Sequence, residues 1–219
     1  MEDAPTIQSP ALSYMIIQTL IVAFVVSYIG SIPPGTINVS VMQLAMLKKR
    51  RAAFFFALAA SVIEFAYAGI TVQFHIFLDS NEQISFYFQI ITSIALIGLG
   101  ISNIFSKSDS SSVKVDTKIT GRHGFLRGVI LGLLNPMTIP FWLAITTYLE
   151  NDGLVNVDGL GFWMYLIGLS SGTFCLLLTV NALGSKFTRI ADNSFLVHKV
   201  PGIILMGLGI YFLSKLVLI

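Results

Sequence analysis

The sequence has little charge and almost no cysteine, and both shortages exclude whole classes of protein. Only 11% of its 219 residues are charged, whereas soluble domains carry about 25%. With 55% hydrophobic residues, such a chain does not cover its surface with polar groups. Apolar stretches near the length that crosses a bilayer recur along it. We therefore expect an all-α integral membrane protein embedded in the lipid bilayer.

The single cysteine, Cys175, lies in an apolar run. One cysteine cannot form an intrachain disulfide, a CxxC redox pair or a thiolate metal site. The three histidines, His75, His123 and His198, fall in loops or at the ends of predicted spans, and none has metal-site spacing with Glu64. We expect no metal, no cofactor and no enzyme activity. The net charge of +2 is not evidence for binding nucleic acid.

Six spans are predicted from the apolar runs between charged breaks, at about residues 12–47, 52–74, 84–105, 125–148, 160–183 and 197–218. As one straight helix the first run would measure about 54 Å, against roughly 30 Å of hydrocarbon. We therefore expect it to be broken at Pro33-Pro34-Gly35. The polar, low-complexity segment 107–123 predicts a cytoplasmic loop between two halves, residues 1–106 and 124–219.

The connections between the predicted spans alternate in charge. Those after the first, third and fifth spans carry Lys and Arg, including KKRR at 48–51, whereas those after the second and fourth are acidic. By the positive-inside rule the basic connections are cytoplasmic, so both termini are expected outside. Lys215 is the one charge that disagrees.

A short repeat relates the two halves. ALIGLGIS at 95–102 is similar to ILMGLGIY at 204–211, which lies 109 residues later, and Pro33-Pro34-Gly35 precedes Asn135-Pro136 by about 101 residues. Because each half has three spans, the second enters the membrane from the opposite side. The pattern predicts two inverted three-helix repeats, whose paired helix breaks indicate a transport site near the midplane. The alternative is chance similarity between glycine-rich helices.

The two breaks supply candidate binding groups. Prolines remove amide donors, so neighbouring carbonyls lose their partners at membrane depth. A half-helix that begins at Gly35 points its N-terminal amides at an anion such as a substrate carboxylate. Asn135 is expected to cap a matching half-helix. The alternative is that both breaks are packing kinks. The predicted substrate-binding residues are Pro34, Gly35, Thr36, Asn38, Ser40, Asn135, Pro136 and Thr138.

Glu64 lies near the middle of the second predicted span, with no other charge between Ala52 and Leu78. Placing a carboxylate at this depth costs several kcal/mol by most measures. Ser61, Glu64, Ala68 and Thr71 share one small and polar face of the helix. Glu64 is therefore predicted to take up a proton or bind a cationic group, and the alternative is a structural acid. In the fifth predicted span, a GxxxG pattern predicts close helix packing.

These motifs resemble those of the LysE-type amino-acid exporters (LysE/RhtB-like translocators). PPGT at 33–36 is similar to the Pro-Gly-Pro motif of their first span, with Thr36 in place of the last proline. GFLRGVILGLLNP at 124–136 matches their Phe, Gly and Asn-Pro pattern, Glu64 matches an acid in their second span, and GIILMGLGIYFL at 202–213 resembles their last span. The likeness covers nearly the whole chain.

The resemblance implies a multi-pass protein of the bacterial inner membrane that exports amino acids or similar small solutes in exchange for protons. A metal-cation exporter of the same superfamily would need several ligands at one depth, and the spans offer one acid. An intramembrane enzyme would need a nucleophile and base within the spans. A non-transporting assembly protein stays open, as does a homo-oligomer.

Overall fold

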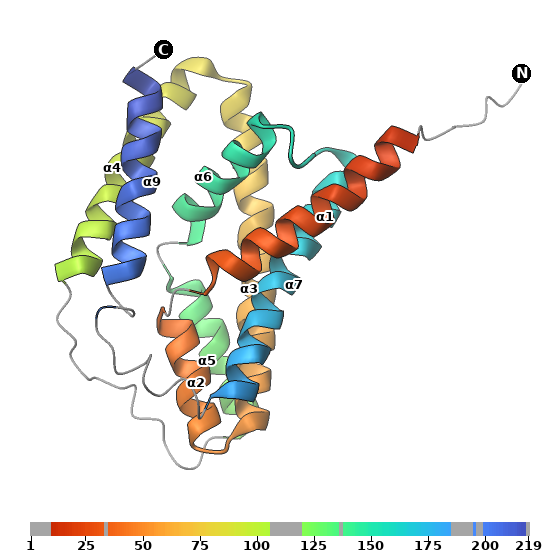
Figure 1. The fold of residues 1–219 in the computed structure, drawn as a ribbon, viewed down its shortest axis with the longest axis vertical. Helices are drawn as coiled ribbons and strands as arrows, with labels where there is room; N and C mark the ends of the chain where they lie inside the picture. The colour runs from red at the N-terminus through yellow and green to blue at the C-terminus, as the bar shows by residue number, and fades with distance from the viewer. Residues whose placement is uncertain are drawn as a thin grey trace, which may run out of the picture.

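The computed structural model describes residues 10–32, 35–105, 120–135, 138–184, 195 and 199–217. All regular structure within these residues is helical. The helices are α1 (Pro10–Gly30), α2 (Thr36–Met46), α3 (Arg50–Asp79), α4 (Glu82–Phe105), α5 (Gly121–Leu133), α6 (Thr138–Asn151), α7 (Gly159–Leu183) and α9 (Val200–Val217). The expected all-α fold is confirmed for the described part of the chain (Figure 1).

Helix length and composition decide which helices can cross a membrane. Four helices, α1, α3, α4 and α7, are long and apolar enough alone, and α5 with α6 makes a fifth candidate, bent by 66° at its break. α2 and α9 are apolar but shorter, with 11 and 18 residues. The chain is thus a multi-pass helical membrane protein, and its described residues contain one or two fewer qualifying spans than the six predicted.

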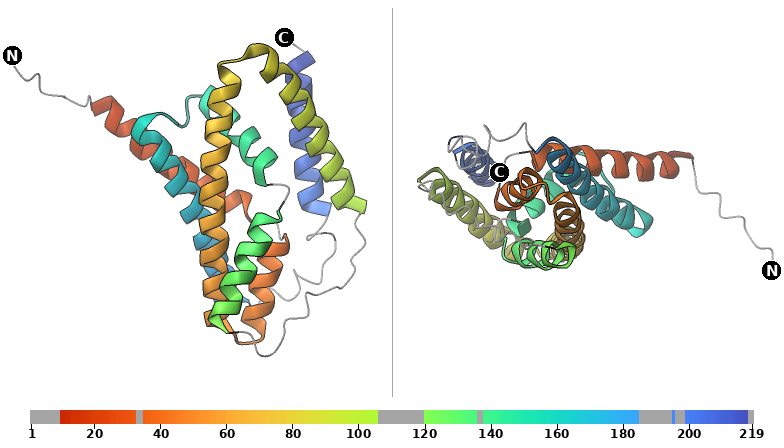
Figure 2. Two further views of the ribbon diagram at one scale, coloured as in Figure 1. Left: turned by 180° about the vertical axis from the view of Figure 1, so that it is seen from behind. Right: turned by 90° about the horizontal axis from the view of Figure 1, so that it is seen from below.

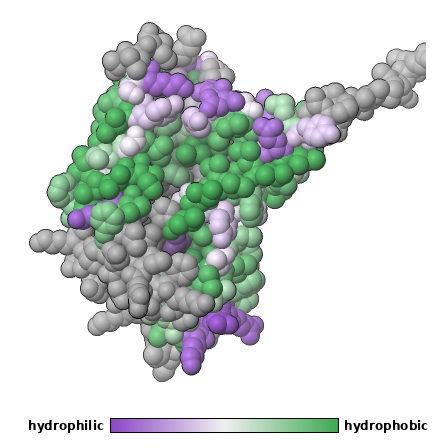
Figure 3. All heavy atoms as spheres, viewed as in Figure 1, coloured by the Kyte–Doolittle hydropathy of each residue, from purple (hydrophilic) through white to green (hydrophobic). Residues whose placement is uncertain are grey.

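The surface of the bundle suits a lipid environment. On the face shown in Figure 3, hydrophobic side chains cover the middle of the molecule and hydrophilic ones gather toward its two ends. Large aliphatic side chains such as Ile17, Ile70 and Ile94 are more than half exposed, at 55%, 54% and 60%. Such exposure over a whole surface is costly in water and favourable against hydrocarbon tails.

Both helix breaks occur where the prolines predict them. α1 ends at Gly30 and α2 begins at Thr36, with Gly35 as the N-cap in extended backbone. α5 ends at Leu133 and α6 begins at Thr138. Pro33, Pro34 and Pro136 lie outside the described residues. A proline ends the preceding helix because it lacks an amide proton and its ring clashes with the previous turn.

α7 packs along α1 through the predicted GxxxG glycines. A side-chain carbon on Gly168 would lie 2.7 Å from the Cβ of Ala23, and one on Gly172 would lie 2.8 Å from the Cβ of Ser27. These separations are shorter than any ordinary contact, so only glycine allows the two backbones to approach this closely. The prediction of close packing at this motif is confirmed.

α5 packs along α3 in a matching way. Here the glycines lie on the broken helix: Gly128 faces Ala59 and Gly132 faces Ile63. α3 and α7 are themselves in contact, so the two pairs lie against each other, as Figure 1 and the reverse view in Figure 2 show. α7 thus packs against α1, one half of the first broken helix, and α3 packs against α5, one half of the second.

α4 and α9 form the third close pair, beside the rest of the bundle (Figure 1). A side-chain carbon on Gly100 would meet the carbonyl oxygen of Gly202 at 2.6 Å and the amide nitrogen of Met206 at 2.8 Å. On Gly209 it would meet the carbonyl oxygen of Ser93 at 2.8 Å and the amide nitrogen of Ile97 at 3.0 Å. The residue numbers rise in one helix as they fall in the other, so the pair is antiparallel.

One predicted boundary was wrong. The second span was expected to end at Phe74, which left His75 at its end, but α3 continues to Asp79. His75 lies inside this helix and is 8% exposed. Hydropathy placed the end of the span too early because a histidine followed by a short apolar run is typical of the beginning of a loop. In the structure the ring of His75 contacts Thr147 and Glu150 of α6.

Candidate functional site

Glu64 lies in the interior of the bundle, where α3 meets α6 and α7. Its Oε1 accepts a hydrogen bond of 2.9 Å from Nε1 of Trp142, a residue of α6 that is 3% exposed. The hydroxyl of Thr173 on α7 is a second hydrogen-bond partner. The acid is therefore held by groups from two other helices rather than left in hydrocarbon, which offsets part of the cost of burying it.

Thr173 extends this contact to the end of α1. Its hydroxyl lies 2.8 Å from that of Ser27 and 3.0 Å from that of Ser31. Ser27 donates its one proton to the carbonyl oxygen of Leu169, at 2.6 Å, so its oxygen can only accept at the contact with Thr173. Thr173 has a single proton, which it can give either to Ser27 or to the Glu64 carboxylate. These hydroxyls form a chain from Glu64 to the residue that follows α1. We call Glu64, Trp142, Thr173, Ser27 and Ser31 the central polar network.

The first helix break joins the central polar network through Asn38. Its Nδ2 donates a hydrogen bond of 2.6 Å to the carbonyl oxygen of Ser31, which lies in the break between α1 and α2. Glu64 and the first predicted break therefore belong to one connected site, although they lie far apart in the sequence.

The other predicted residues of α2 are placed as follows. Gly35 and Thr36 are exposed at the beginning of α2, and no heavy atom lies within 4 Å of where a Cβ on Gly35 would be. Ser40 is buried and donates to the carbonyl oxygen of Thr36 at 2.7 Å. Pro34 lies outside the described residues. The described part of this break is thus open on the side of Gly35 and closed around Ser40.

The second break reaches the central polar network through α6. Asn135 and Thr138 are partly buried, and the amide of Thr138 lies 3.4 Å from the carbonyl oxygen of Asn135. Trp142, which holds Glu64, follows Thr138 by four residues and so lies one helical turn along α6. Pro136 lies outside the described residues. The hydroxyl of Tyr67 donates to the carbonyl oxygen of Leu133, at 2.8 Å, where α5 ends.

Sequence reasoning missed Trp142, Ser27 and Ser31. Ser31 follows Ser27 by four residues and lies just after the end of α1, and such a spacing is a weak signal because serine is common at packed membrane interfaces. Trp142 follows the second break by about two turns, and only its pairing with Glu64, 78 positions away, gives it meaning. Among the described residues, no group of three or more His, Cys, Asp or Glu side chains could hold a metal ion.

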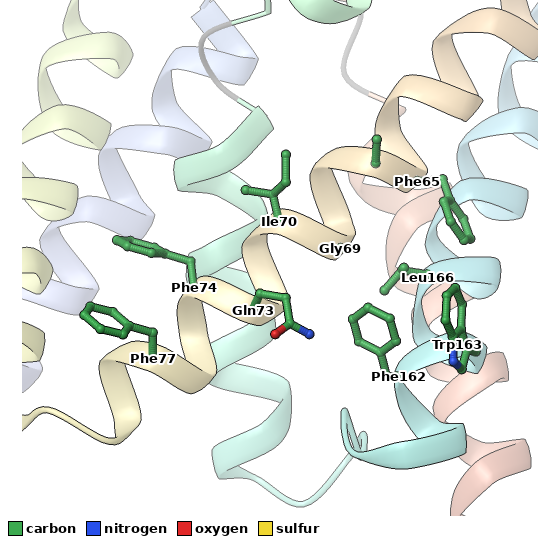
Figure 4. Close-up of a pocket in the computed structure, with 10 residues that line it drawn as sticks. Phe65, Gly69, Ile70, Gln73, Phe74, Phe77, Phe162, Trp163 and Leu166 are labelled. Carbon is green, nitrogen blue, oxygen red and sulfur yellow. The ribbon is translucent and has the colours of Figure 1, made fainter.

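A separate apolar groove of about 560 Å³ lies between α3 and α7 (Figure 4). Aromatic and aliphatic side chains line it, and Gln73 is its one polar side chain. Its wall includes Trp163, which is 52% exposed. The groove offers no charged group to a polar solute and faces outward, so it differs in chemistry from the central polar network.

Comparison with known families places these features in context. A family model described as LysE type translocator matches residues 28–216, which includes both breaks and the whole central polar network except Ser27. No curated protein and no solved structure matches the chain.

Proposed function

Because the chain belongs to the LysE type translocator family, we propose that it exports amino acids or related small solutes across the bacterial cytoplasmic membrane in exchange for protons. The observation that carries this proposal is the position of Glu64. The acid is partly buried between α3, α6 and α7, and the hydroxyls of Thr173 and Ser31 connect it to the first helix break. A group that can take up a proton therefore lies in the same network as the predicted substrate site.

We further propose that the fold consists of two inverted three-helix repeats. The hydroxyl of Ser170 donates to the carbonyl oxygen of Ser61 at 2.8 Å, and the two residues are 109 positions apart. Glu64 and its partner Thr173 are also 109 positions apart. This equals the spacing of the repeated motif, as expected where α3 and α7 cross at a two-fold axis.

The contacts between α4 and α9 support the same relation. Adding 109 to Ser93, Ile97 and Gly100 gives Gly202, Met206 and Gly209. Gly100 approaches the oxygen of Gly202 and the nitrogen of Met206, and Gly209 approaches the oxygen of Ser93 and the nitrogen of Ile97. The two contacts are equivalent, because in each one a glycine of one helix meets a backbone oxygen and a backbone nitrogen at corresponding positions of the other helix. Because the two helices are antiparallel, the two-fold axis that relates them is perpendicular to the helices, as inverted repeats require.

This arrangement suggests how transport and proton uptake are coupled. Asn38, Ser31 and Thr173 lie between the first break and Glu64. Substrate binding at the break and proton binding at Glu64 would therefore change the same set of hydrogen bonds, so each would affect the other. Alternating access would then expose the site to each side in turn, by movement of one half against the other. Gly35 and Thr36 at the beginning of α2 would receive a substrate carboxylate through backbone amides.

The test is efflux from proteoliposomes that contain the purified protein and an equimolar mixture of ¹⁴C-labelled amino acids. We expect an imposed pH gradient, acidic on the side that receives the solute, to accelerate efflux of at least one amino acid. Liposomes without protein and liposomes with the gradient collapsed by an uncoupler are the controls. If no amino acid leaves faster with protein than without it, the proposal is wrong.

A further inference from the structure

A polar seam runs between α3 and α6 from Glu64 to the end of the bundle. On α3, Glu64, Ala68, Thr71 and His75 follow one another at spacings of four, three and four residues, so they share one helix face. On α6, Trp142 lies against Glu64 and Glu150 lies against His75. The two polar contacts between the helices thus lie about 16 Å apart, at 1.5 Å per residue. Thr71 lies between them on α3, where Ala68 also packs against Trp142 and Leu149 of α6.

His75 closes the outer end of this seam. Its Nδ1 lies 3.1 Å from the hydroxyl of Thr147, and its Nε2 contacts Oε2 of Glu150. The side chain of His75 is 10% exposed and that of Glu150 is 31% exposed. The imidazole is thus covered, whereas its carboxylate partner reaches solvent at the end of α6 that leads into the acidic connection.

Thr71 occupies the interval between His75 and Glu64. It is completely buried, and its hydroxyl oxygen has no hydrogen-bond partner among the described residues. A buried hydroxyl without a partner costs about 1–3 kcal/mol, so a packing role alone would favour valine here. Ala68, the residue between Thr71 and Glu64 on this face, is small and leaves little side-chain bulk beside the seam.

We propose that the seam formed by Glu150, His75 and Thr71 is the pathway by which protons reach Glu64 from the outer side of the membrane. This inference rests on the proposed proton-coupled export. In export coupled to proton entry, the midplane acid must be loaded from outside, and this is the side on which the loop charges place the acidic connection.

Each proton would move along the seam in steps that return Glu150 and His75 to their starting charges. The Glu150 carboxylate takes a proton from outer water and passes it to Nε2 of His75. The imidazolium gives up the proton on Nδ1, the nitrogen beside Thr147, to a water molecule that would enter the seam beside the Thr71 hydroxyl, and it returns to neutral imidazole protonated on Nε2. The water would pass the extra proton to the Glu64 carboxylate, and rotation of the ring would restore the Nδ1-protonated form for the next proton. Other titratable groups near this end are Tyr148 and Asp152, two residues on either side of Glu150, and Tyr165 of α7, whose hydroxyl lies 2.7 Å from that of Thr146.

The test separates proton movement from solute movement. Thr71→Val keeps the shape of the side chain and removes its hydroxyl, and His75→Gln removes the titratable ring. Proteoliposomes loaded with the dye pyranine report proton uptake, and exchange of ¹⁴C-labelled for unlabelled amino acid, with no gradient, reports solute movement. We expect both variants to lose gradient-driven efflux and proton uptake by about tenfold or more, with exchange within about twofold of the parent.

Two controls make the outcome specific. Ser93→Ala on α4 also removes a buried hydroxyl without a partner among the described residues, away from the seam, and His123→Gln removes an exposed histidine; both are expected to behave like the parent. Parental proton uptake in Thr71→Val overturns the pathway, whether or not His75→Gln folds. A proportional loss of exchange and proton uptake also overturns it, because that is the signature of a structural role. Absence of proton uptake in the parent overturns the proposed coupling as well.

Discussion

At the scale of single residues, Glu64 is the side chain on which the proposed mechanism depends. A buried carboxylate that only stabilises packing can be replaced by its amide with little loss, since the amide keeps the shape and adds no charge. One that gives and takes a proton cannot. We expect Glu64→Gln to insert and fold normally but to lose gradient-driven efflux, while Glu64→Asp keeps some activity. Efflux measured against pH for both variants and the parent is the check, and unchanged gradient-driven transport in Glu64→Gln would remove the acid from the mechanism.

Trp142 gives a second prediction at this scale, because the chain contains a built-in control. Trp142 donates to Glu64 and is buried, whereas Trp163, the other tryptophan, is 52% exposed in the wall of the apolar groove. A hydrogen bond to a charged group contributes about 1.5–3 kcal/mol. Trp142→Phe should therefore slow gradient-driven efflux by about tenfold or more, and Trp163→Phe should not. Equal rates for the two variants would assign Trp142 to packing.

Residues such as Glu64 can be found from sequence because the cost of a lone charge in an apolar span depends only on the span. Trp142 cannot be found in this way, since its role arises from contact with a helix that is distant in sequence. His75 shows a third case. The sequence contains it plainly, but its burial against Thr147 and Glu150 follows from the path of α6 after the second break.

At the scale of helices, two glycines that look alike in sequence have opposite surroundings. A Cβ on Gly35 would meet nothing within 4 Å, whereas one on Gly172 would lie 2.4 Å from the carbonyl oxygen of Phe24. The backbone of Gly35 is extended, with φ at −93°, and any residue can adopt it. One glycine therefore marks an open helix N-terminus and the other a packed interface.

We expect Gly35→Leu to abolish export while leaving the protein inserted and stable, because the larger side chain blocks approach to the amides at the beginning of α2. The measurement is efflux together with thermal unfolding in detergent. Normal efflux by this variant would show that the first break is a packing kink.

The matched change is Gly172→Leu, which forces α1 away from α7. Overpacking of this kind costs typically 1–3 kcal/mol, so we expect a melting temperature several degrees below that of the parent, in contrast to Gly35→Leu. An unchanged melting temperature would mean that α1 and α7 are packed less closely than the structure shows.

At the scale of the whole molecule, composition and hydropathy predicted the helical membrane fold, and the prolines predicted both breaks. The number of full spans was harder, because α2 and α9 are too short to qualify on length and composition. Hydropathy merges α1 and α2 into one run, since it records the apolar character of residues and not the direction of the helix. In the sequence, only a short motif suggests the proposed inverted relation between the halves, and contacts such as Ser61 with Ser170 support that proposal at the level of residues.

The loop charges predict the orientation of the molecule in the membrane, and this gives the last prediction. The basic connections are expected in the cytoplasm and the acidic ones outside, which is also the orientation that the proposed proton pathway needs. On a Cys175→Ser background, a cysteine at Ser111, in the long basic connection, should not react with an impermeant thiol reagent added to intact cells. A cysteine at Ser80, an exposed residue in the acidic connection between α3 and α4, should react readily, and lysed cells should label at both positions. The reverse pattern would invert the topology, and it would then place the seam from His75 to Glu64 on the cytoplasmic side, where it would release protons rather than load them.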